Sequence, residues 1–164
     1  MSTSTGSTPE PAQEAEPDAW SAVALVRESP EAMVVADPEG IIRLWNGGAE
    51  RMFGHSAAEA LGSSLDLIIP ERQRSRHWQG YTRTMATGQT RYGDQLLAVP
   101  ATHRDGRRLS IEFGVALLRD TEGRIAGISA VIRDVTERRA AERALRTGPA
   151  EPGCRVPARL PQAD

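Results

Sequence analysis

Apolar side chains occupy every second position of residues 109–117: Leu109, Ile111, Phe113, Val115 and Leu117. Such an alternation places all of them on one face of an extended chain, so it predicts a β-strand with one buried face. Turn-forming sequences precede and follow it at residues 104–107 (RDGR) and 120–123 (DTEG). Short turns join antiparallel strands, so we expect the neighbouring segments 91–103 and 125–133 to pair with this strand.

A second hairpin is predicted near the start of the chain. Residues 32–37 (AMVVAD) and 41–45 (IIRLW) are short apolar segments, separated by residues 37–40 (DPEG). Proline in the second position and glycine in the fourth favour a type I turn. The sequence therefore predicts two strands here and three after residue 90, five in all.

The residues between these two groups of strands carry helix signals. Asn46 is a good N-cap for a helix that ends at Gly54. Ser56 followed by Glu59 forms a capping box for a second short helix. A longer helix is predicted over residues 70–86, because Pro70 suits a first helical turn. The fold class we expect is α+β, a five-stranded antiparallel sheet with short helices on one side.

Composition divides the chain into a core and flanks. Residues 1–17 contain no large apolar side chain and residues 147–164 hold four prolines, so both are predicted to be disordered tails. Residues 18–30 predict an N-terminal flanking helix and residues 135–146 a C-terminal one. The core is expected over residues 31–134.

Charge and cysteine content exclude several classes of function. All 20 basic residues are arginine, so chemistry that needs a lysine is excluded. Against 22 acidic residues the net charge is −2, which argues against nucleic-acid binding. The single cysteine, Cys154, excludes a disulfide framework. No nucleophile elbow, paired-glutamate motif or phosphate loop is present, so we do not expect an enzyme.

No membrane association is expected from the sequence. It contains no apolar run of about 18 residues. Its first 17 residues also lack the basic start and apolar stretch of a signal peptide. We therefore expect a cytoplasmic setting.

The order of motifs resembles the PAS domain family over about residues 21–146. The motifs are a strand, DPEG, a strand ending in WN, a helix ending in MFG, the turn HRDGRR, a long strand and a closing RDVTERR, which is the most specific. The resemblance implies a sensory module with a small ligand between the sheet and the middle helices. The signal would pass through Asp134 and Thr136 to the last helix, and from there to an unidentified signalling protein or output domain.

The middle helix suggests a cofactor. Its sequence RSRH at residues 74–77 is similar to the helix of haem-binding PAS oxygen sensors, in which the histidine coordinates iron. The resemblance therefore implies haem b, with His77 as the iron ligand. Those sensors place an arginine across the haem, where this sequence has Gln95 and Leu97. Further expected cofactor-binding residues are Trp78, Tyr81, Ile111, Phe113 and Ile128.

Three other interpretations remain open. In the first, His77 is a partly buried helix residue with a local hydrogen bond. A flavin is the second, without the covalent step of the light-sensing subgroup, because Cys154 lies in the tail and not in the helix region. The third is a ligand-free adaptor for protein–protein interaction. In each case a homodimer is expected through the helix near Trp20–Arg27, because its apolar face lies outside the sheet core.

Overall fold

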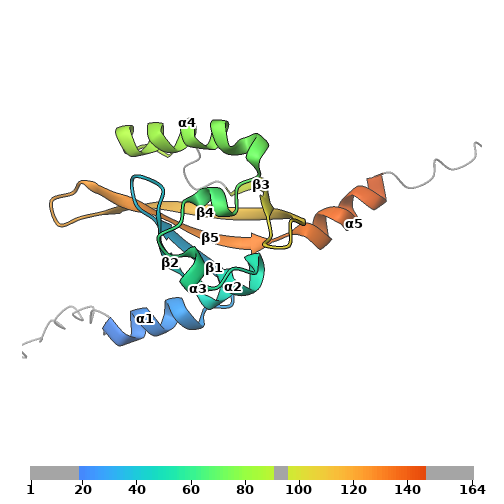
Figure 1. Cartoon of the computed structure of the whole chain (residues 1–164), viewed down its shortest axis with the longest axis horizontal. Helices are drawn as coiled ribbons and strands as arrows, with labels where there is room; N and C mark the ends of the chain where they lie inside the picture. Colours follow the sequence, from blue (N-terminus) through green and yellow to red (C-terminus); the bar gives the residue numbers. More distant parts are fainter. Residues whose placement is uncertain (1–18, 91–95, 147–164) are drawn as a thin grey trace, which may run out of the picture.

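The computed structural model describes residues 19–90 and 96–146, with side chains from residue 21 onward. The predicted tails, 1–17 and 147–164, lie outside these ranges, as does Gln95. Five antiparallel strands form one sheet in the order β2-β1-β5-β4-β3. They are β1 (Ala32–Ala36), β2 (Ile42–Trp45), β3 (Leu97–Thr102), β4 (Arg108–Arg119) and β5 (Ile125–Asp134). The α+β prediction is confirmed (Figure 1).

The helices follow the predicted order. They are α1 (Ala19–Glu28), α2 (Gly47–Phe53), α3 (Ala57–Ala60), the 3-10 turn η1 (Leu65–Leu67), α4 (Glu71–Thr87) and α5 (Thr136–Arg146). The caps of the short helices are confirmed. Asn46 accepts from the Ala49 amide at 2.9 Å, and Ser56 and Glu59 form the capping box. In Figure 1, α4 lies along the sheet and α5 extends away from one end of it.

The register of the sheet places the predicted apolar residues on one face. Phe113 in β4 lies opposite Ile132 in β5 and opposite Leu97 in β3. Residues directly opposite one another point to the same side, so these side chains share the face that α4 covers. Pro100 lies in β3, which is an edge strand, where the missing amide hydrogen costs no ladder bond inside the sheet.

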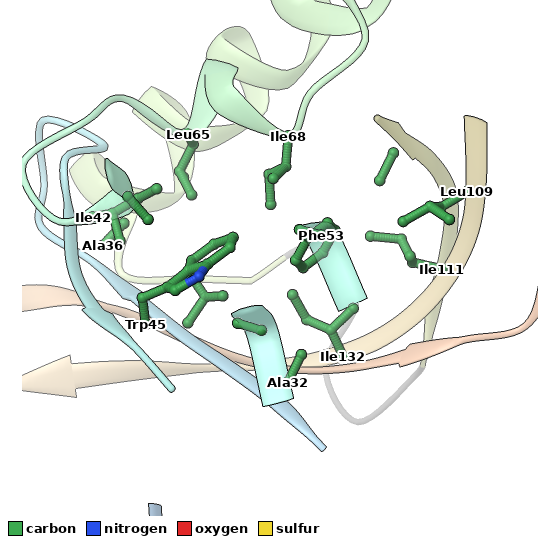
Figure 2. Packing of buried hydrophobic residues seen from close by; sticks show 14 of the residues in the cluster. Ala32, Ala36, Ile42, Trp45, Phe53, Leu65, Ile68, Leu109, Ile111 and Ile132 are labelled. Atoms are coloured by element: carbon green, nitrogen blue, oxygen red, sulfur yellow. The ribbon is translucent and has the colours of Figure 1, made fainter. Parts of the chain in front are cut away.

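The core lies between this inner face and α2, α3, η1 and α4. Its largest fully buried side chains are Phe53 and Ile42. The Phe53 ring packs beside that of Trp45 (Figure 2), with 5.3 Å between the ring centroids. The Trp45 indole donates to the His55 carbonyl at 3.0 Å. Burying one such side chain stabilises the fold by about 1.5–3 kcal/mol. Within the described ranges, no helix is long and apolar enough to cross a membrane.

Asn46 does more than cap α2. Its side chain is buried and also accepts from the Met33 amide at 2.8 Å. Its amide donates to the carbonyls of Val26 and Glu31, at 2.9 and 3.0 Å. One side chain therefore joins α1, β1 and α2. The sequence predicted the cap, and the structure adds the other three bonds.

Candidate functional site

Three side chains anchor α4, the helix that carries the predicted ligand residues. The Trp78 indole donates to the Asp66 carboxylate at 2.9 Å, and Arg74 donates to the Asp66 carbonyl at 3.0 Å. The Tyr81 hydroxyl donates to the Asp37 carbonyl at 2.5 Å. Burial raises the pKa of Tyr81 to about 12, so its hydroxyl keeps its proton and stays a donor. These bonds fix α4 to η1 and to the first hairpin turn.

Trp78 also packs against that turn. A Cβ atom on Gly40 would lie 2.3 Å from the Trp78 ring, and the φ of Gly40 is +79°. The sequence indicates glycine here for the turn alone. Its second role, leaving space for an aromatic ring from residue 78, depends on a long-range contact with no local sequence signal.

His77 is half-buried beside two aromatic rings. Its ring centroid lies 5.0 Å from that of Trp78 and 5.6 Å from that of Tyr81. Burial lowers the pKa of His77, with the charge of Asp66 opposing this effect. The Nδ1 atom is buried and has no hydrogen-bond partner among the described residues. A neutral imidazole of this kind keeps a nitrogen lone pair for a ligand or a metal.

The predicted ligand residues around His77 are largely apolar and come from both α4 and the sheet. Tyr81 and Ile111 belong to the buried core, and Trp78, Phe113 and Ile128 pack against it as partly buried side chains. Leu97 shares their face through its pairing with Phe113 and is half-buried. The structure thus brings together the predicted residues that it describes, with His77 at the edge of the cluster.

These residues fit haem in their chemistry but less well in the space around them. The imidazole of His77 suits iron, because its buried Nδ1 atom makes no hydrogen bond within the described part of the chain. The space is less suitable. Two hollows in the described ranges, of about 210 and 380 Å³, lie over Gly114 and Val131 and between α1 and β2, not beneath α4. Neither hollow is lined by His77.

The start of α5 is tied to β4. The Asp134 carboxylate accepts from the Thr136 amide at 2.8 Å and from its hydroxyl at 2.5 Å. The Thr136 hydroxyl oxygen accepts from the Ser110 amide, and the Val135 amide donates to the Ser110 carbonyl, both at 2.8 Å. Sequence reasoning selected Asp134 and Thr136 and missed Ser110. Ser110 contributes only backbone groups, so residue type gave no signal.

Comparison with known proteins agrees with this geometry. A family model described as PAS fold matches residues 26–140. An uncharacterized protein of Azorhizobium caulinodans is 35% identical over 123 residues, 74% of this chain and 16% of that protein. Sensor protein FixL of Bradyrhizobium diazoefficiens is 31% identical over 113 residues, 69% of this chain and 22% of that protein. The chain therefore spans about a fifth of the length of these relatives.

A solved structure shows the same fold. The PAS domain of a protein from Colwellia psychrerythraea superposes with a TM-score of 0.63 at 20% identity, covering 72% of this chain and 97% of that one. At this identity the likeness concerns the fold alone. The family match, the strand order and the motifs predicted from the sequence agree with one another. This chain belongs to the PAS family, whose domains are sensory modules of signal transduction.

Proposed function

We propose that this domain binds a small molecule between α4 and the inner face of β3, β4 and β5. The signal then leaves through Asp134 and Thr136 along α5 to a partner signalling protein or output domain. The observation that carries this proposal is the buried Nδ1 atom of His77, which has no partner in the described ranges. An unsatisfied buried polar atom costs about 1–3 kcal/mol, and a ligand that bonds to it would recover that cost.

Native mass spectrometry of the purified protein, combined with its absorption spectrum, tests the ligand site. We expect a bound small molecule in the wild type and its loss in His77→Phe, which keeps a ring but removes both nitrogens. His55→Phe is the matched control, because His55 lies in the loop between α2 and α3, and it should retain the molecule. If the wild type carries nothing and no candidate ligand raises its melting temperature, the ligand site is rejected.

A haem-based gas or redox sensor is the second candidate, favoured by the Nδ1 atom of His77, which has no hydrogen-bond partner in the described ranges. When bound, haem would supply an iron centre that responds to a gas or to redox state. Reconstitution with haemin should give a Soret band in the wild type and none in a folded His77→Ala variant. A colourless protein that takes up no haem would exclude this candidate, and the same spectrum reports a flavin.

A ligand-free adaptor that dimerises is the third candidate. It is supported by exposed apolar side chains on α1, since Val23 is 65% exposed and Leu25 is 71% exposed. Sedimentation equilibrium should show a homodimer that Val23→Gln and Leu25→Gln weaken. Glu122→Gln, in the exposed turn between β4 and β5, is the control and should leave the dimer unchanged. A monomer at high concentration would contradict both the dimer and the adaptor.

A further inference from the structure

Neighbouring residues of β4 contact the proposed ligand face on one side of the sheet and the exit helix α5 on the other. Ile111 is buried in the core and Phe113 packs against it, both on the face proposed to meet the ligand. Ser110 and Glu112 alternate with them and therefore point to the opposite side. Ser110 bonds to Val135 and Thr136, and Glu112 bonds to Arg138 in the first turns of α5. One strand thus contacts both the proposed ligand face and the exit helix.

The contact between Glu112 and Arg138 is an ion pair between sheet and helix. Its N–O distance is 2.5 Å, and the Glu112 side chain is only 19% exposed whereas that of Arg138 is 54% exposed. The hydrogen bond to Glu112 raises the pKa of Arg138 above its usual value. Arg138 also lies 3.7 Å from Glu142 within its own helix.

The body of α5 lies outside the core. None of its residues 136–146 is buried, and Leu145 is 85% exposed. Val135, just before the helix, is buried and fixes its base. Beyond that base, an ion pair between Glu112 and Arg138 joins the body of the helix to the sheet. The contacts at the point where α5 leaves the sheet (Figure 1) thus include the pair Glu112–Arg138.

We propose that Glu112 is the positioning residue of the exit helix, and that a displacement of β4 by a ligand reaches α5 through its bond to Arg138. This inference rests on the proposed function and names how its signal would leave the domain. A ligand that presses on Ile111 or Phe113 moves the same strand backbone that carries Glu112. A ligand can shift the helix only if it binds one arrangement of β4 and the Glu112–Arg138 contact more tightly than another. The size of the shift is limited by that difference in affinity.

Hydrogen exchange of the α5 amides in the full chain, without ligand, tests the first half of this proposal. Glu112→Gln removes the charge of the pair and should speed exchange by about two- to fivefold, the effect of losing one exposed ion pair. Glu142→Gln is the control, because it removes only the partner of Arg138 within the helix, and it should change exchange much less. The charge reversal Glu112→Arg with Arg138→Glu should restore slow exchange. Wild-type exchange in Glu112→Gln would overturn the proposal.

The second half concerns transmission from the inner face. Phe113→Leu alters the side chain proposed to meet the ligand and keeps it apolar. It should speed α5 exchange in the wild type and have a smaller effect in the Glu112→Gln background. Equal effects in both backgrounds would show that Glu112 does not transmit the change. Neither measurement uses a ligand, so failure here is distinguishable from failure to find a ligand at His77.

Discussion

At the scale of single residues, Asn46 shows how much one polar side chain can contribute to this fold. It is buried and makes four hydrogen bonds, to Met33, Ala49, Val26 and Glu31. Removing it leaves buried and part-buried backbone groups without these partners, and a fully buried group of this kind costs about 1–3 kcal/mol.

We therefore predict that Asn46→Ala lowers the free energy of unfolding by about 2–4 kcal/mol. Ser56→Ala is the comparison, because it removes an exposed helix cap and should cost about 0.5–2 kcal/mol. Urea unfolding followed by circular dichroism measures both. Equal losses would show that the bonds of Asn46 to α1 and β1 add nothing to its cap.

The second residue-scale prediction concerns pH. Burial lowers the pKa of His77 below its ordinary 6.5. The unfolded chain then binds more protons than the folded one, so protonation favours unfolding. The melting temperature should fall as the pH drops from about 7 through 6.5 and towards the lowered pKa.

His77→Gln should flatten this pH dependence. His55 also has a pKa lowered chiefly by burial, so His55→Gln removes a separate part of the same slope. The measurement is the melting temperature between about pH 5 and pH 7.5, the range in which histidine titrates. Identical slopes in the wild type and in His77→Gln would contradict the burial of His77.

At the scale of elements, the anchoring of α4 on the first hairpin turn can be tested with a pair of glycines. Gly40 and Gly62 have φ values of +79° and +81°, so alanine is strained to the same extent at both, by about 1–2 kcal/mol. They differ in surroundings. A Cβ on Gly40 would meet the Trp78 ring at 2.3 Å, whereas one on Gly62 would meet nothing within 4 Å.

Gly40→Ala is therefore predicted to cost about 1–3 kcal/mol more than Gly62→Ala, because overpacking adds to the backbone strain. Chemical denaturation of both variants gives the difference. Trp78→Leu in the Gly40→Ala background should recover part of the extra cost. Equal stabilities of the two alanine variants would mean that Trp78 does not hold α4 against the turn.

The elements themselves were predictable because their signals are local. The caps at Asn46 and Ser56 and the alternation from Leu109 to Leu117 each depend on residues a few positions apart. The tertiary contacts of the site were not predictable in the same way. The contact of Trp78 with Gly40 joins residues 38 positions apart, and that of Thr136 with Ser110 joins residues 26 positions apart. In the second contact, Ser110 takes part only through its backbone. The sequence selected His77, but the isolation of its Nδ1 depends on the whole arrangement around it.

At the scale of the whole molecule, stability is expected to be uneven. β5 lies between β1 and β4, so both its edges are hydrogen-bonded, and Ile132 is buried. α5 is held at Val135, Thr136 and Arg138, and none of its own residues is buried. Elements with few buried contacts open locally at a lower free energy than the core.

Native-state hydrogen exchange should therefore separate these two elements. The β5 amides should exchange only through global unfolding, so their exchange should be slowed by the full free energy of unfolding of the domain. The α5 amides should exchange faster, through local opening. Asn46→Ala should then speed exchange in β5 in proportion to its loss of stability and change α5 much less. Glu112→Gln should do the reverse. If both variants speed both elements equally, α5 unfolds together with the core. A helix that unfolds only with the core cannot change its direction while the domain stays folded, and it could not carry the signal as proposed.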